Sequence, residues 1–291
     1  MALVSLKEIL QDARAAKYAV PMFDVANPQM IRMAVEVAEE LNSPVILAAI
    51  EPDLPGNRLN FWANAANYAA INAKVPVAYM LDHATNFAIC KRCAEAGFTG
   101  VMLDASSKDF EENIRLTREV ADLMHKYGVS VEAELGHVGD AQAGQGEGAA
   151  LGNKADDHNV YTDPASVEEF IERAKCDALA VSIGTAHGIY KTAPTLQIEL
   201  LAEINKVSKV PLVLHGGSGT PEDQIKAAIA NGISKVNICA EMMYAWHKTW
   251  LDVLQAAPNL GFLECVAQVE PEKAMMDVMR KKIRLFGSNR D

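Results

Sequence analysis

Residues Pro211–Gly219 read PLVLHGGSG, a sequence typical of a buried strand that is followed by a histidine and a glycine-rich segment. The first four residues are almost entirely apolar, as a strand covered on both faces requires. His215 follows at once, and then come Gly216, Gly217, Ser218 and a third glycine. An ordinary flexible turn would leave the histidine unexplained. The stretch therefore predicts a metal-binding side chain next to backbone N–H groups that can hold an anion.

Seven further apolar runs of similar length recur along the chain, and helical patterns separate them. They are Ala19–Val25, Pro44–Ile50, Pro76–His83, Gly100–Ser106, Val129–His137, Ala178–Gly184 and Lys235–Glu241. Eight strand–helix units in one chain predict an α/β fold, a (β/α)8 TIM barrel, as a single domain over residues 1–291. A doubly wound open sheet is the alternative. It rarely needs eight units, and no G-x-G-x-x-G follows the first strand.

Composition limits the possible partners and locations. The chain has 291 residues, half of them hydrophobic, and a net charge of −11, which argues against nucleic-acid binding. Its first twenty residues carry charges throughout, unlike a signal peptide, and no apolar run is long enough to span a membrane. We expect a cytoplasmic protein. Cys90 and Cys93 form a C-x-x-C, but without a second pair they are predicted to be reduced structural thiols.

Two segments depart from the strand–helix pattern. Gly139–Asn159 is long, irregular and rich in glycine and alanine. Loops of this length in a compact domain are usually functional, so a mobile active-site lid is predicted at 139–159, with a tolerated surface insertion as the alternative. From about residue 242 the chain is predicted to form a C-terminal helical extension.

Polar residues gather where the predicted strands end, which is where active sites of such barrels lie. His83, His187 and His215 come from three different strand ends, and three imidazoles with an open position make a catalytic zinc site. Zinc beside a phosphate site suits a phosphorylated ketose. Asp82 is the natural carboxylate to carry a proton. However, neighbours on a regular strand point to opposite faces, so either the strand ends at this point or only one of Asp82 and His83 faces the site.

Several blocks together resemble one family. They are LDHATNF (81–87), GFTGVMLDASSKDFEENIRLT (97–117), VEAELGHVG (131–139), the block from YTDPAS to GTAHGIY (161–190), and VPLVLHGGSG (210–219). The sequence resembles the class II, zinc-dependent fructose-bisphosphate and tagatose-bisphosphate aldolases over nearly its whole length. The resemblance implies a lyase of carbohydrate metabolism. It would cleave a ketose 1-phosphate or 1,6-bisphosphate reversibly to dihydroxyacetone phosphate and an aldehyde.

The resemblance also implies roles for individual residues. His83, His187 and His215 would bind Zn²⁺, with Asp82 as the proton carrier. Asp104 and Glu134 match acidic residues of a neighbouring or alternative metal position. The phosphate of the dihydroxyacetone phosphate half would be held by Gly188, Gly216, Gly217 and Ser218, and Asn237 would touch the substrate. A monovalent cation, Na⁺ or K⁺, near that phosphate and a homodimer or larger homo-oligomer are also implied.

Two departures from the family pattern affect the expected chemistry. Gln142 stands where the family has a loop glutamate, and an amide cannot act as a base, so Glu147 is the expected second catalytic residue. Ile50 replaces a serine that helps to hold the distal half of the substrate. We therefore expect a substrate with one phosphate, or with a distal acid bound differently, unless Arg280 or Arg284 of a neighbouring subunit binds a second phosphate. A non-catalytic or regulatory zinc- and phosphate-binding barrel and a metal-dependent sugar-phosphate isomerase are the alternatives.

Overall fold

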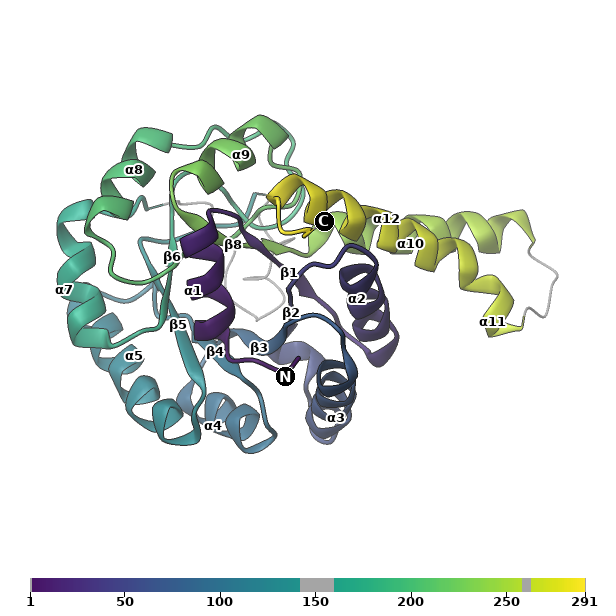
Figure 1. Cartoon of the computed structure of the whole chain (residues 1–291), viewed down its shortest axis with the longest axis horizontal. Helices are drawn as coiled ribbons and strands as arrows, with labels where there is room; N and C mark the ends of the chain where they lie inside the picture. The colour runs from purple at the N-terminus through teal and green to yellow at the C-terminus, as the bar shows by residue number, and fades with distance from the viewer. Residues whose placement is uncertain (1, 142–159, 258–262, 291) are drawn as a thin grey trace.

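The computed structural model describes residues 2–141, 160–257 and 263–290, and its centre is a closed barrel of eight parallel strands (Figure 1). The strands are β1 (Val20–Asp24), β2 (Val45–Ile50), β3 (Val77–Ala84), β4 (Gly100–Leu103), β5 (Ser130–Leu135), β6 (Ala178–Val181), β7 (Leu212–Leu214) and β8 (Ile233–Ile238). They pair in chain order, and β8 returns to β1. The predicted (β/α)8 barrel is confirmed.

Helices surround the barrel. They are α1 (Leu6–Ala16), α2 (Pro28–Glu40), α3 (Arg58–Asn72), α4 (Phe87–Glu95), α5 (Phe110–Met124), α7 (Pro164–Ala174), α8 (Ile198–Val207), α9 (Glu222–Ala230), α10 (Ala240–Ala256), α11 (Glu264–Ala267) and α12 (Val269–Phe286). Two short 3₁₀ turns, η1 (Glu51–Asp53) and η2 (His125–Tyr127), follow β2 and α5. Asparagine and aspartate side chains at Asn27, Asn86, Asp109 and Asp163 cap the first turns of four helices, as N-cap residues do.

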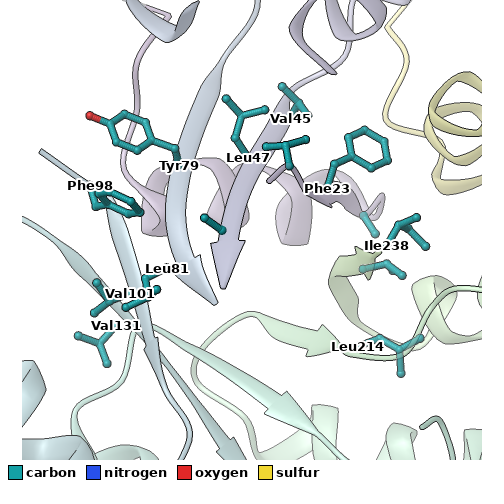
Figure 2. Close-up of a cluster of buried hydrophobic side chains, with 14 of the residues drawn as sticks. Phe23, Val45, Leu47, Tyr79, Leu81, Phe98, Val101, Val131, Leu214 and Ile238 are labelled. Atoms are coloured by element: carbon teal, nitrogen blue, oxygen red, sulfur yellow. The ribbon is translucent and has the colours of Figure 1, made fainter. Parts of the chain in front are cut away.

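Continuous apolar runs in the strands arise because both strand faces are buried. Phe23, Leu47 and Tyr79 point outward into the layer between strands and helices (Figure 2). Their neighbours Met22 and Ile46 point into the barrel, where α1 also packs its apolar face. Alternation thus places the apolar strand residues in one of two layers, outside the barrel wall or within it.

The last part of the chain seals the barrel beside its first strand. Val20 of β1 pairs with Lys235 of β8, and the N–H of Ala19 donates to the carbonyl oxygen of Phe286 at 3.2 Å. In Figure 1, α10 and α12 run side by side away from the barrel, and α12 also contacts α2, α9 and β1. These helices occupy the region of the predicted C-terminal extension. Within the described residues no helix is long and apolar enough to cross a membrane.

The predicted lid lies mostly outside the described residues. Of 139–159, the structure describes only the first three residues, and the N–H of Ala141 donates to the carbonyl oxygen of His187 at 2.8 Å. The start of this segment is therefore attached to the loop that follows β6. The lid itself stays a prediction.

Candidate active site at the carboxyl end of the barrel

Three histidines converge at the carboxyl ends of the strands. His83 lies in β3, and His187 and His215 follow β6 and β7. One ring nitrogen from each lies within 4.8 Å of the other two, and Nε2 of His83 is 2.8 Å from Nδ1 of His215. All three side chains are buried. The predicted set of three imidazoles is thus a spatial cluster.

A bulge in β3 brings both Asp82 and His83 to this cluster. Leu81 pairs with Val101 of β4, and Ala84 pairs with Leu103. Three steps along β3 therefore match two steps along β4, so β3 contains one extra residue. The irregularity lies at His83, whose backbone has a φ of +44°, in the left-handed region that residues other than glycine rarely adopt. Asp82 and His83 each have a side-chain atom near His215 as a result. Both residues can reach the cluster because the strand is not regular here.

A carboxylate orients His83. Oδ2 of Asp104 lies 3.0 Å from Nδ1 of His83, while Oδ1 accepts bonds from the N–H and the hydroxyl of Ser106. Burial would raise the pKa of Asp104, but these hydrogen bonds hold it well below its usual value. An ionised Asp104 fixes the proton of His83 on Nδ1, so Nε2 is the nitrogen that would bind a metal.

A second carboxylate orients His215, and the sequence reading missed it. Oε1 of Glu132 lies 3.0 Å from Nε2 of His215, and both Glu132 oxygens accept bonds of 2.9 Å from Nζ of Lys235. Glu132 and Lys235 are fully buried inside the barrel. The alternation of strand residues indicates this position. Glu132 lies on the same face of its strand as Glu134, and Lys235 lies on the same face as Asn237.

Burial favours the neutral form of His187 and His215, which is the form that binds metals. The pKa of His187 and of His215 lies well below the ordinary value because both rings are desolvated and because His83 is close. Three imidazole nitrogens, two of them on rings oriented by carboxylates, are the donor set that a catalytic zinc ion requires. The site therefore fits the metal that the sequence implied.

Two further predicted residues offer acceptors at the site. Asn237 donates from Nδ2 to Oδ2 of Asp82 at 3.1 Å. Among the described residues, Oδ1 of Asp82, Oδ1 of Asn237 and Oε2 of Glu134 have no hydrogen-bond partner. Burial, followed by the charge of Asp104, raises the pKa of Glu134 to about 8. Glu134 also groups with His83 and Asp104 as a second set of possible metal ligands.

The glycines after β7 fit only as glycines. Gly216 has a φ of +65°, and a Cβ there would lie 2.4 Å from the carbonyl oxygen of Ala186. A Cβ on Gly217 would lie 2.4 Å from Cγ1 of Val236. The backbone of this segment therefore packs directly against its neighbours, and the N–H of Gly217 already donates to the carbonyl oxygen of Asn237 at 3.1 Å.

Ser218 and Tyr190 hold this glycine segment in place. Oγ of Ser218 accepts bonds from the N–H groups of Cys239 and Glu241 at 3.2 and 3.3 Å, at the start of α10. The hydroxyl of Tyr190 accepts a bond from the N–H of Ala186 and lies 2.9 Å from the carbonyl oxygen of Gly216. The loops that carry His187 and His215 are thus tied to each other.

The comparisons with known proteins agree with this geometry. A family model described as fructose-bisphosphate aldolase class-II matches residues 4–291. The chain belongs to this family. It is therefore a lyase, and the reaction of the family is aldol cleavage.

Individual aldolases are similar over most of their length. Fructose-bisphosphate aldolase of Geobacillus stearothermophilus is 40% identical over 266 residues, which are 89% of this chain and 88% of that protein. The 6-phospho-5-dehydro-2-deoxy-D-gluconate aldolase of Bacillus subtilis is 37% identical and covers 99% of this chain, with 97% of its own length. The crystal structure of the YdjI aldolase from Escherichia coli K12 superposes with a TM-score of 0.83 at 34% identity, over 99% of this chain and 98% of that one.

Two cysteines and two loop residues that the sequence singled out lie away from the site or outside the described residues. Cys90 and Cys93 lie buried in α4, and burial raises the pKa of the Cys90 thiol to about 12, as structural thiols would show. Neither belongs to the possible metal-ligand groups among the described residues. Gln142 and Glu147 lie outside the described residues, so the second proton carrier stays a prediction.

Proposed function

We propose that this aldolase cleaves a phosphorylated ketose reversibly to dihydroxyacetone phosphate and an aldehyde, with zinc bound by His83, His187 and His215. The convergence of three buried imidazoles beside a glycine-lined segment carries this proposal. When bound, zinc would polarise the ketone and stabilise the negative charge that develops on its oxygen. The protein supplies the proton transfers and holds the substrate.

Asp82 is proposed to carry the proton of the carbinol. Its free oxygen would accept the proton from the hydroxyl that becomes the aldehyde during cleavage, and it would return this proton in the condensation direction. The bond from Asn237 to the other oxygen keeps the carboxylate facing the site. A second proton must move at the carbon of the three-carbon half. Glu147 is proposed to move it, and Asp104 and Glu134 are proposed to form an alternative metal position.

The phosphate of the three-carbon half is assigned to Gly188, Gly216, Gly217 and Ser218. Because Oγ of Ser218 accepts two N–H groups, its own proton remains available to a phosphate oxygen. Backbone N–H groups next to the start of α10 favour an anion at this position. A nearby Na⁺ or K⁺ is part of the proposal, by likeness to the family.

The distal half of the substrate is proposed to carry no second phosphate. Ile50 pairs with Asp82 and ends β2, so an apolar side chain lies at this part of the barrel mouth. The next residue, Glu51, accepts the hydroxyl of Thr85 at 2.7 Å, and Asn86 donates to that same hydroxyl oxygen while it caps α4. The hydroxyl of Thr85 is thus already used, and the Glu51 carboxylate beside it would repel an anion. A phosphate dianion placed next to these residues would be desolvated beside a negative charge.

The relatives support both kinds of distal group. The name fructose-bisphosphate aldolase indicates a substrate with two phosphates, whereas 6-phospho-5-dehydro-2-deoxy-D-gluconate has one phosphate and a carboxylate. Arg280 is already bound to Glu40 and Asp277 of its own chain, so it is a poor source of a distal phosphate contact. We favour the substrate with one phosphate.

The test is a panel of ketose 1-phosphates and fructose 1,6-bisphosphate, with release of dihydroxyacetone phosphate as the readout and Asp82→Asn as the inactive control. Cleavage of one or more monophosphates supports the proposal. A tenfold or larger advantage in kcat/KM for the bisphosphate, about 1.4 kcal/mol of transition-state preference, would refute the single-phosphate part. Interconversion of sugars without a three-carbon product would instead identify an isomerase.

We also propose that the protein is a homo-oligomer of the cytoplasm. Exposed apolar side chains occur along α10 and the segments after it, namely Tyr244, Leu251, Leu254, Leu263, Val266 and Val269. A projecting pair of helices with such residues suits burial against a second copy. Sedimentation analysis at micromolar concentration tests this, and a monomer would contradict it.

A further inference from the structure

Two donors from distant parts of the chain converge on one carboxylate oxygen beside the anion cradle. Oε2 of Glu241 accepts a bond from the N–H of Gly219 at 3.1 Å, and it lies 2.6 Å from Nζ of Lys282. Glu241 is in the first turn of α10, whereas Lys282 is in α12. The Lys282 side chain is only 4% exposed, so its ammonium group is buried against this carboxylate.

Glu241 faces the same space as the cradle. With Gly188, Ser218 and Gly219 it lines a cavity of about 380 Å³, and 29% of its side chain is exposed there. A negative charge at this position would oppose the binding of a phosphate dianion, unless a cation compensates it. Lys282 is the cation that lies in direct contact with it among the described residues.

We infer that Lys282 is a positioning residue for the substrate phosphate, acting through Glu241. This inference rests on the proposed phosphate site. Lys282 cancels the charge of Glu241 and fixes the carboxylate that holds the N–H of Gly219. The cradle is thereby attached to α12 by one ion pair, next to the point where Ser218 binds the start of α10.

The first test is Lys282→Met, which keeps the length of the side chain and removes its charge. The uncompensated Glu241 should raise the KM for the phosphorylated substrate by roughly tenfold, with kcat changed by less than about twofold, because the interaction is with the phosphate and not with the reacting atoms. Lys209→Met is the control. Lys209 is exposed and pairs at the surface with Glu168 and Glu172, away from Glu241, so this variant should keep the wild-type KM.

The second test separates charge from structure. Combining Glu241→Gln with Lys282→Met removes both charges and should restore KM to within about threefold of wild type, since nothing then repels the phosphate. Lys282→Arg should also restore it in part. If the double variant binds substrate as poorly as Lys282→Met, the role is structural and the inference is wrong. An unchanged KM in folded Lys282→Met would also overturn it.

Binding of inorganic phosphate keeps this test independent of the reaction. Titration calorimetry on the zinc-loaded full chain measures the phosphate affinity of wild type and of each variant. If wild type binds phosphate and Lys282→Met binds it equally well, the inference fails while the proposed phosphate site stands. If wild type binds neither phosphate nor dihydroxyacetone phosphate, the proposed function fails at its phosphate site.

Discussion

Lys235 and Glu132 form an ion pair that should be among the most sensitive positions of the barrel. Nζ of Lys235 donates to both oxygens of Glu132 at 2.9 Å, and neither residue has any exposed surface. Lys235→Met preserves the length of the side chain but leaves the Glu132 carboxylate buried, with His215 as its hydrogen-bond partner and an oxygen of Asp82 within 4.8 Å. Removing one partner of a buried pair usually costs about 3–5 kcal/mol, because the remaining charge has no compensation.

This loss can be measured as a shift in the melting temperature. For a chain of 291 residues, the entropy of unfolding is about 0.6 kcal/mol per kelvin, so the substitution should lower Tm by about 5–8 °C. Differential scanning calorimetry of the metal-free protein is the appropriate assay, because bound zinc would add its own stabilisation. Lys209→Met is the control. Lys209 pairs with Glu168 and Glu172 at the surface, and the loss of such pairs should leave Tm nearly unchanged.

A double variant decides whether charge is the cause. Glu132→Gln combined with Lys235→Met removes the charge from both residues and leaves an amide oxygen that can still accept from His215. It should recover most of the lost stability. If Lys235→Met melts within 1 °C of wild type, or if the double variant is no more stable than the single one, the pair does not have the energetic role derived from its burial.

Three further expectations follow from the site and its surroundings. His215→Ala should lose most bound zinc and most activity together, because two imidazoles leave an incomplete site, and full zinc occupancy by metal analysis would contradict the ligand set. Burial raises the pKa of Asp53 in the folded state above its value in the unfolded chain. The protonated carboxyl group therefore stabilises the fold at a pH below the unfolded pKa, and this stabilisation is lost as the pH rises through the folded pKa. Asp53→Asn should therefore gain stability relative to wild type as the pH of urea titrations rises through this range. Cys265 is exposed and should react quickly with a thiol reagent at pH 8, whereas Cys90 should react only on unfolding, and equal rates would refute the burial argument.

Much of the architecture could be predicted from the sequence because it depends on local patterns. Continuous apolar runs separated by helical periods require strands buried on both faces, and eight of them close into a barrel. The histidines could be predicted for the same reason, because all parallel strands end at one rim. A local pattern thus specified a convergence of residues more than a hundred positions apart.

Features that depend on register or on a distant partner could not be predicted in this way. The bulge at His83 is a shift in the register between β3 and β4, so the sequence of neither strand alone predicts it. The pairing of Glu132 with Lys235 could not be predicted because 103 residues separate them, and a buried lysine is unexpected without a partner. Gln142 and Glu147 lie outside the described residues, so the loop chemistry still rests on the sequence alone.

The closure of the barrel has a consequence for how the chain is made. About 215 residues separate Val20 of β1 from its partner Lys235, and the carbonyl of Phe286 that binds Ala19 comes later still. At ordinary rates of synthesis, roughly 10–40 s pass between the synthesis of β1 and that of β8, and during this time one edge of β1 has no partner strand. An unpaired strand edge can pair with other chains, so the nascent protein needs protection during this interval. Ribosome-bound chains that stop before Ile233 should bind chaperones more strongly than full-length chains, and equal binding would show that the open edge is protected in another way.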